Sequence, residues 1–305
     1  MFNTPILLIA FNRPETTKIV FDSIKKIKPN KLYIAIDGPR NEHPEDKNKI
    51  NNVKNIFKDI PWECDLFFLI REQNKGCKHS VSEAIDWFFK SEDFGIILED
   101  DCLPTEDFFI YCSDLLQKYK NENQILMITG DNFQDGISRG DSSYYFSKLT
   151  HVWGWATWKR AWEKYDVNMS FWPKFKTSKE FKNIFHLYMA KKYFTSIFDS
   201  VYNGRIDTWD YQWTACVWYN NGLCITPNKN LVKNIGFGPD ATHTKLETMR
   251  SNNQRTESIL PLTHPKNIFR DNKADEYVFK NVLRGSKISL IKNFFKKLFS
   301  LIRLF

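Results

Sequence analysis

The segment Gly95-Ile96-Ile97-Leu98-Glu99-Asp100-Asp101 sets three consecutive carboxylates directly after a short apolar run. An apolar run of this length is typical of a buried β-strand. Like charges at the mouth of such a strand repel one another and lose hydration, which is costly. A hard divalent cation such as Mn²⁺ or Mg²⁺, which binds one or two carboxylates together with phosphate oxygens, would offset this cost. The alternative is that the acidic residues only end the strand and open a turn before Pro104.

Outward from this segment, the first 130 residues alternate short apolar runs with amphipathic stretches. This alternation is typical of β-α-β units that build a mostly parallel sheet. The sequence therefore predicts an α/β, Rossmann-like fold with helices flanking a central sheet, and the sheet-building half is expected to end near Gly130. Strands are expected at Ile6–Phe11, Lys31–Asp37, Asp65–Ile70, Phe94–Leu98 and Ile125–Thr129, and helices at Glu15–Ile27, His43–Lys58, Val81–Lys90 and Asp107–Tyr119.

Ligands of open parallel sheets bind beyond the carboxyl ends of the strands. Asn12 and Arg13 follow the first predicted strand, Asp37 the second, and Arg71 the third. An arginine there can neutralise phosphate, and an aspartate can accept a hydrogen bond from a base N–H. Arg13 and Asp37 can instead be turn residues only.

The second half is rich in aromatic residues, since most of the ten tryptophans lie between residues 150 and 220. Here we expect Trp-rich helices, one of them at Thr157–Tyr165, and a strand at Leu223–Thr226. Clustered tryptophans can stack on sugar rings or fill a core.

The segment Ile97 to Pro104, followed by Asp107-Phe108-Phe109-Ile110-Tyr111, resembles the metal-binding segment of the N-acetylglucosaminyltransferase I type of GT-A enzyme. The resemblance implies a GT-A fold and a sugar nucleotide as donor. It also implies that Asp101 binds the metal, while Asp100, together with Glu99, binds the nucleoside.

The resemblance implies further donor contacts elsewhere in the first half. Asn12 and Arg13 stand where that family places a donor-binding arginine, and Asp37 stands where it places an acidic residue that binds the base. His79 and Ser80 lie in a region where the family touches the nucleotide, and the match does not choose between them.

Two segments of the second half extend the resemblance. Trp153-Gly154-Trp155 resembles the family's Gly-Trp segment under the reactive centre, where Gly154 would allow close approach of the backbone and Trp155 would be a sugar platform or core. Thr208-Trp209-Asp210-Tyr211-Gln212-Trp213 resembles the Trp-Asp segment that supplies the catalytic base of inverting members. The resemblance implies Asp210 as the base, with Trp209 beside the sugar. Tyr211 departs from the family's second acidic residue, so Asp207 stays an alternative, and Asp210 can also be a buried helix cap.

The segment Ile235 to His243 resembles a glycine-containing loop of the family that ends in a histidine. Loops of this kind often close over a bound diphosphate. His243 is therefore a candidate third metal ligand or phosphate contact, with a plain surface residue as the alternative.

The last segment, Lys287 to Phe305, carries five basic residues and no acidic one, which is most of the net charge of +8. On helical spacing its apolar and basic residues fall on opposite faces, a pattern typical of a helix that lies in a membrane interface. The alternative is a terminal helix docked on the domain or on a second subunit. Without a recognition motif elsewhere, nucleic acid is not expected as a partner.

These patterns divide the chain into a catalytic domain at 1–245, an extension at 246–285 and a membrane-associating helix at 286–305. Residues 1–130 form the expected nucleotide-sugar half of the catalytic domain, and residues 131–245 the acceptor half. The six cysteines show no C-x-x-C pair or disulfide spacing, the start shows no secretory signal, and no run of ~20 apolar residues occurs. We therefore expect a cytoplasmic protein, peripheral on the inner face of the cell membrane.

The predicted function is transfer of a sugar from a nucleotide-diphospho-sugar, with UDP as the expected nucleotide, to a hydroxyl of a glycan or lipid-linked acceptor. One alternative is a nucleotidyltransferase, but Phe11-Asn12-Arg13-Pro14 lacks the glycines of a phosphate-binding loop. Another is a non-catalytic carbohydrate-binding protein, whose acidic motif would be broken, whereas here all three carboxylates are present.

Overall fold

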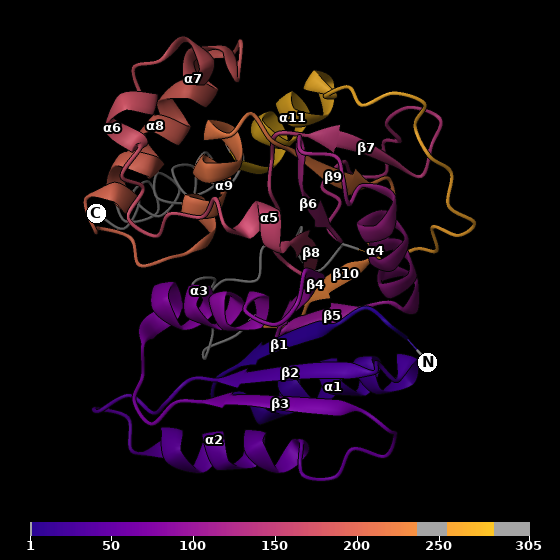
Figure 1. Ribbon diagram of the computed structural model, residues 1–305. Coiled ribbons are helices and arrows are strands. Elements are labelled where there is room, and N and C mark those ends of the chain that lie inside the picture. Colours follow the sequence, from indigo (N-terminus) through magenta and orange to yellow (C-terminus); the bar gives the residue numbers. More distant parts are fainter. Residues whose placement is uncertain (1, 237–254, 284–305) are drawn as a thin grey trace, which may run out of the picture.

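The computed structural model describes residues 2–236 and 255–283. A single sheet of eight strands runs through this part of the chain, in the order β3-β2-β1-β4-β8-β6-β9-β7 (Figure 1). Six strands run in one direction, and β7 and β8 run in the other. The strands are β1 (Ile6–Ala10), β2 (Lys31–Ile36), β3 (Asp65–Ile70), β4 (Phe94–Glu99), β6 (Ile125–Thr129), β7 (Tyr144–Ser147), β8 (Trp155–Trp158) and β9 (Leu223–Pro227).

A second, two-stranded sheet lies at the carboxyl edge of the large one. It pairs β5 (Cys102–Pro104) with β10 (Val232–Asn234) in antiparallel register. Because β5 follows the acidic triplet directly, this pairing brings a segment from the second half of the chain next to Glu99, Asp100 and Asp101.

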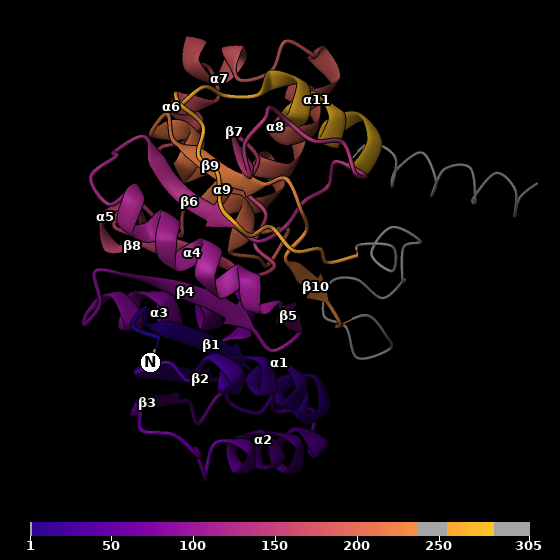
Figure 2. The same cartoon turned by 90° about the vertical axis from the view of Figure 1, so that its right-hand side faces the viewer.

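Helices cover both faces of the sheet (Figures 1 and 2). On one face, α1 (Pro14–Ile27), α2 (Glu45–Ile56) and α4 (Glu106–Lys118) share a single apolar core. The other face carries the second core, formed by α3 (Gly76–Phe89), α5 (Lys159–Trp162), α6 (Trp172–Phe175), α7 (Lys179–Asn183), α8 (Tyr188–Tyr202), α9 (Asp210–Tyr219), α11 (Asn272–Val278) and the π-helical turn η1 (Phe279–Leu283).

Strand β1 illustrates why these residues form a central strand. Its five residues are all apolar and buried, with Ile6 and Leu8 in one core and Leu7 and Ile9 in the other. A strand buried on both faces reads as a continuous apolar run, not as an alternating one. The prediction of an α/β protein with a mostly parallel central sheet flanked by helices is therefore confirmed.

The predicted strands of the first half, and β9, differ from the structure by at most one residue at either end. Helix α3, however, begins at Gly76, five residues before its predicted start at Val81. Its first turn, which holds Lys78, His79 and Ser80, is polar and so gives no apolar periodicity to detect.

Two expectations for the second half were wrong. Trp155–Trp158 is strand β8, which lies antiparallel between β4 and β6, and the helix begins only at Lys159. All four residues of β8 are buried, so no alternation distinguishes this short strand from a helix. The sheet also does not end near Gly130, because β7, β8 and β9 continue it.

Within residues 2–236 and 255–283, no helix is both long and apolar enough to cross a membrane. The predicted terminal helix at 286–305 lies outside the described residues, as does His243.

A buried carboxylate is one of the contacts by which residues 255–283 pack onto the rest of the protein. Asp275 accepts hydrogen bonds from Ser147 Oγ, from Lys148 N at 3.1 Å and from Arg270 Nε at 2.6 Å. The Asp275 side chain is 1% exposed and that of Arg270 is 17% exposed, so neither charge is well hydrated. This extension is therefore part of the folded domain.

Replacing Asp275 with alanine leaves the Arg270 guanidinium and the Lys148 N–H without their acceptor. Loss of one partner of a buried ion pair typically costs about 3 kcal/mol or more. We expect the free energy of unfolding, measured by urea denaturation, to fall by about that amount. Glu276→Ala, which removes only an exposed pair with Lys280, is the control and should change it by less than about 0.5 kcal/mol. Equal losses in the two variants would contradict the anchoring role.

Candidate functional site

An arginine and three carboxylates meet where β1 and β4 end. Glu99 is the last residue of β4, and its register partner in β1 is Ile9. Arg13 donates from Nη1 to Asp101 Oδ2 at 2.8 Å and from Nη2 to Asp100 Oδ1. One guanidinium thus bridges two consecutive carboxylates, a geometry that a lysine cannot reproduce.

The main chain adds to this arrangement. Phe11 N donates to Asp100 Oδ2 at 3.0 Å, so Asp100 is held by both the backbone and the arginine. On the other side, Ile235 N donates to the Asp101 carbonyl at 2.8 Å. A Cβ on Gly236 would lie 2.0 Å from Asp101 Oδ2, so only glycine permits this close approach.

The cluster carries more negative than positive charge. Burial, together with the charges of Asp101 and Asp100, raises the pKa of Glu99 to about 8. Burial also raises the pKa of Asp100 to about 6, although Arg13 opposes the shift. Burial alone would lower the pKa of Arg13, but Asp100 and Asp101 raise it instead. A single arginine therefore does not balance the three carboxylates.

The structure places Asp210 near this cluster. Asp210 is the first residue of α9, and its charge is one of those that raise the pKa of Glu99. Cys77, in the first turn of α3, is close enough to these groups to sense their charges: burial raises the pKa of its thiol, and Glu99, Asp210, Asp207 and Asp37 raise it further. Carboxylates from both halves of the chain thus contribute to the electrostatics of the same site.

Asp37 connects the loop after β2 with the loop after β3 through hydrogen bonds. Its Oδ1 accepts from Gly38 N at 2.9 Å and Lys75 N at 3.1 Å, and its Oδ2 accepts from Asn74 Nδ2 at 2.9 Å. Ser80 lies nearby and receives hydrogen bonds from Arg71, to its carbonyl at 3.0 Å and to its hydroxyl at 3.1 Å. Both oxygens of Asp37 are therefore already engaged.

The other first-half candidates lie outside the acidic cluster. Asn12 donates to Asp46 Oδ1 at 2.6 Å, and the fully buried Asp46 is also held by Arg40. His79 is half exposed, 3.9 Å from a carboxylate oxygen of Glu83.

Trp155 and Trp209 are buried, with exposures of 0% and 3%. Their rings stack on each other at a centroid distance of 5.5 Å, and Trp213 packs 5.9 Å from Trp155. Neither ring presents an open face to a sugar in this arrangement. Gly154, with φ of +73°, lets the chain pass Val232, whose Cγ2 would lie 2.8 Å from an added Cβ.

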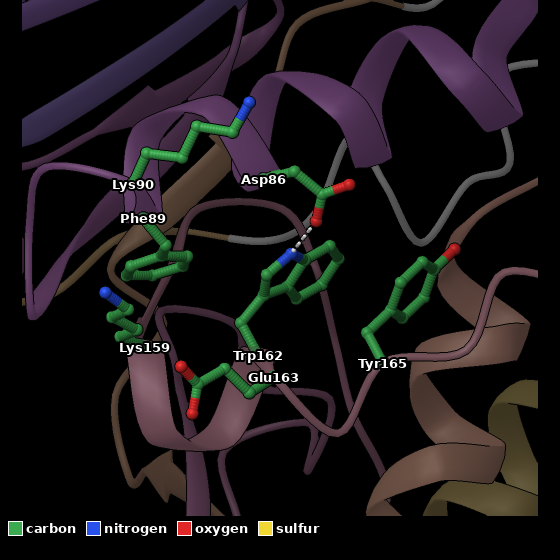
Figure 3. A pocket seen from close by; sticks show the side chains of 7 residues that line it. All are labelled: Asp86, Phe89, Lys90, Lys159, Trp162, Glu163 and Tyr165. Carbon is green, nitrogen blue, oxygen red and sulfur yellow. Dashed lines mark hydrogen bonds between the residues drawn. The ribbon is translucent and has the colours of Figure 1, made fainter.

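A hydrogen-bonded and stacked path connects α3 to the segment that holds Asp210, and Figure 3 shows its first part, from Asp86 to Tyr165. Trp162 Nε1 donates to Asp86 at 2.7 Å, and the Trp162 ring stacks on Tyr165 at 4.3 Å. Tyr165 Oη in turn donates to the Trp209 carbonyl at 3.2 Å. Asp86, Trp162 and Tyr165 line a cavity of about 410 Å³ whose other walls are Phe89, Lys90, Lys159 and Glu163 (Figure 3).

Sequence reasoning did not identify Asp131. Its side chain is 1% exposed, one oxygen accepts from Trp153 N at 3.0 Å, and the other has no partner within the described part of the chain. Burial raises its pKa well above the usual value. Its position two residues after the apolar run Ile125–Thr129 is the signal that could have found it, because Asp101 likewise lies two residues after β4 ends.

The carboxylates of Glu99 and Asp101 fit a hard divalent cation by donor type and by charge. The described residues hold no group of three or more His, Cys, Asp or Glu side chains arranged to bind a metal alone. Mg²⁺ and similar ions, however, are commonly held by one or two carboxylates with phosphate and water completing the shell. The excess negative charge at this site matches that mode of binding.

Comparison with known proteins leaves the family open. No protein-family model matches the sequence, and no curated protein matches it. Among solved structures, mouse xyloside xylosyltransferase 1 is similar with a TM-score of 0.36 and 9% identity, over 70% of this chain and 81% of that chain. HddC from Yersinia pseudotuberculosis matches with a TM-score of 0.32 and 10% identity, over 55% and 83%. The 4-diphosphocytidyl-2C-methyl-D-erythritol synthase from Anaerococcus prevotii matches with 0.30 and 12%, over 64% and 84%. We base no functional argument on similarities of this size.

The half-buried His151, beside the Trp153-Gly154 turn, gives a prediction for pH dependence. Its ring lies 4.6 Å from that of Phe133, and burial lowers its pKa to about 4. In the unfolded chain its pKa is near 6.5, so between these values the unfolded state binds the extra proton. The free energy of unfolding should therefore decrease as the pH falls from about 6.5 to about 4.

The measurement is the melting temperature of the protein and of His151→Asn as a function of pH. The variant should lose less stability over this range, whereas His79→Asn, at a half-exposed position, should follow the parent protein. Parallel curves for the parent and His151→Asn would contradict the prediction.

Proposed function

We propose that this chain is a metal-dependent glycosyltransferase of the GT-A type. It would move a sugar from a nucleotide-diphospho-sugar, with UDP as the expected nucleotide, to a hydroxyl of a glycan or lipid-linked acceptor. The observation that carries the proposal is the convergence of Glu99, Asp100 and Asp101 with Asp210 beyond the carboxyl ends of β1 and β4. Ligands of open α/β sheets bind in this position.

The first-half residues would hold the donor. Asp101, with Glu99 beside it, would bind Mn²⁺ or Mg²⁺, and Asp100 would face the nucleoside. The cation, when bound, would neutralise the charge of the departing diphosphate. Arg13 donates one hydrogen bond to each aspartate from its two Nη atoms, which orients the two carboxylates relative to each other.

Asp210 would be the base of an inverting transfer. Its Oδ1 accepts from Thr208 Oγ1, and within the described residues no basic side chain pairs with it. The second oxygen would accept the proton of an acceptor hydroxyl as that hydroxyl attacks the anomeric carbon. Tyr165 supports this segment through the Trp209 carbonyl.

The remaining candidates have supporting roles in this proposal. Asp37 and Ser80 would shape the pocket for the base, and Gly154 would set the backbone under the donor sugar. Buried Trp155 and Trp209 would hold that backbone in place. His243 would join the metal or the diphosphate from the segment after Gly236. A cytoplasmic, membrane-surface location would suit a lipid-linked or envelope glycan acceptor.

Two aspartate variants separate donor binding from transfer. Asp101→Asn should abolish Mn²⁺-dependent binding of the donor, measured by calorimetry with a panel of UDP-, GDP- and CMP-sugars. Asp210→Asn should keep donor binding and lose transfer by about 10²- to 10⁴-fold, because only the proton acceptor is removed. Asp22→Asn, an exposed surface change of the same charge, is the control and should alter neither quantity.

The outcome also distinguishes the alternatives. If the intact chain binds none of the sugar nucleotides, the glycosyltransferase proposal fails. Formation of a sugar nucleotide from a nucleoside triphosphate and a sugar phosphate would identify a nucleotidyltransferase instead. Loss of transfer in Asp207→Asn, with Asp210→Asn active, would move the base to Asp207.

The basic segment Lys287 to Phe305 would hold the enzyme at an anionic membrane. Each basic residue near such a surface contributes on the order of 1 kcal/mol, so deleting the segment should weaken binding more than roughly hundredfold. The measurement is co-sedimentation of the full chain, and of the chain without residues 287–305, with vesicles containing phosphatidylserine. Neutral vesicles are the control, and equal sedimentation of both proteins with anionic vesicles would exclude this role.

A further inference from the structure

A second cavity lies at the same edge of the sheet as the acidic cluster. Strand β8 runs antiparallel to both of its neighbours, β4 and β6, so β4, β6 and β9 share one direction and their carboxyl ends lie at one edge (Figure 1). The loops that follow β6 and β9 border a cavity of about 420 Å³, which Arg255, Glu257 and Val282 complete. Its volume falls within the roughly 300–1,000 Å³ of ligand pockets, and ligands of open α/β sheets bind at this edge.

Amide side chains hold the two loops in place. Asn230 Oδ1 accepts from Asn132 N at 3.0 Å, and Asn132 Nδ2 donates to the carbonyl of the last residue of β9 at 2.6 Å. Asn228 Nδ2 donates to the carbonyls of Arg139 and Ser142 at 2.9 and 2.8 Å. Asn132 and Asn230 are 8% and 7% exposed. These walls are thus ordered before a ligand arrives, and a site that needs little ordering loses less affinity on binding.

The charges of the ionisable side chains around this cavity cancel. Asp135 and Glu257 are set against Lys229 and Arg255, and Lys229 Nζ lies 2.6 Å from Glu257 Oε2. The half-buried Phe133 adds an aromatic ring to the lining. A hydroxyl group both donates and accepts hydrogen bonds, so it can pair with carboxylates and with cationic groups alike. The lining therefore suits a ligand with many hydroxyl groups, an apolar face and no charge, which is the chemistry of a neutral saccharide.

A chain of contacts leads from this cavity to the proposed base. The ring of Phe133 packs on that of His151 at 4.6 Å. Next to His151, Thr150 Oγ1 hydrogen-bonds with Thr214 Oγ1, which donates to the Asp210 carbonyl at 3.0 Å. Strand β8 alone separates β4 from β6, so the ends of β4 and β6 lie two strand spacings apart, roughly 10 Å. This separation is short enough for one oligosaccharide to extend from the cavity to the acidic cluster.

We propose that this cavity binds the acceptor, and that the acceptor is an uncharged oligosaccharide. Its inner sugar units occupy the cavity beside Phe133, while the hydroxyl at its end reaches Asp210. A uronate or phosphate group gains no net attraction from a lining whose charges cancel, yet it loses hydration, so it binds more weakly than a neutral sugar. The role of this saccharide as acceptor rests on the proposed glycosyltransferase function, whereas its binding in the cavity does not.

The test is calorimetric titration of the full chain, without donor or metal, with neutral and with uronate-containing disaccharides and trisaccharides. Neutral saccharides should bind, and Glu257→Ala and Arg255→Ala should each weaken binding roughly tenfold, because each removes a hydrogen-bonding group that is charged. Glu276→Ala, which likewise removes the carboxylate partner of a lysine, is the matched control and should bind like the parent protein. With donor present, both cavity variants should raise the KM for the acceptor and leave that for the donor unchanged.

The outcomes separate this proposal from the proposed function. If the chain binds a sugar nucleotide but no saccharide of the panel, or if neither cavity variant alters saccharide binding, the acceptor cavity is overturned and the glycosyltransferase proposal stands. If neutral saccharides bind and no sugar nucleotide does, the cavity is supported as a saccharide site and the proposed function fails. Tighter binding of uronate-containing saccharides, strengthened further by Glu257→Ala, overturns the uncharged class. Circular dichroism checks folding, and if one variant does not fold, the other decides.

Discussion

The guanidinium of Arg13 holds the two aspartates that follow β4, and the candidate site depends on this one interaction. Neither Asp100 nor Asp101 is well hydrated, since their side chains are 3% and 15% exposed. Without a nearby cation, two adjacent carboxylates in this position would repel each other and favour protonation. Arg13 stands where β1 ends and α1 begins, so the same contact fixes the turn after β1 against the turn after β4. The same contacts of Arg13 therefore determine both the electrostatics of the site and the packing of the first β-α unit.

The second half of the chain is organised around a different force, the burial of large aromatic rings. Trp155, Trp162, Trp209 and Trp213 contact one another with centroid distances between 5.2 and 6.5 Å. Stacked and edge-to-face rings at such distances have well-defined relative orientations. Because Asp210 follows Trp209 directly, its position is set by a rigid aromatic core. A flexible loop would not fix a carboxylate against Glu99 in this way.

The parts of the fold that could be predicted are those in which local sequence and burial agree. The apolar runs of β1, β2 and β4 are long enough to predict these strands from sequence. Their ends, and with them the positions of Arg13 and Glu99, could therefore be located. Strand β8 was not, because a four-residue strand of buried residues after a glycine has no period of its own. The engagement of Asp37 could not be predicted either, since its partners, Asn74 and Lys75, reach it only once β2 and β3 are paired. Likewise, sequence left open whether Trp155 was a sugar-stacking platform or a core residue, and only the packing of Trp213 in α9 against Trp155 in β8 shows that it is buried.

The segment that covers β7 comes from the end of the described chain, and this has a consequence for biosynthesis. During translation, β7 and β9 leave the ribosome well before Thr263, Arg270 and Asp271, which later shield the β7 edge. Until then the nascent sheet has two open edges, and an open edge can pair with another chain. The central sheet is therefore assembled early but protected late, which makes the interval between these events the stage at which the nascent protein is most exposed to misassembly.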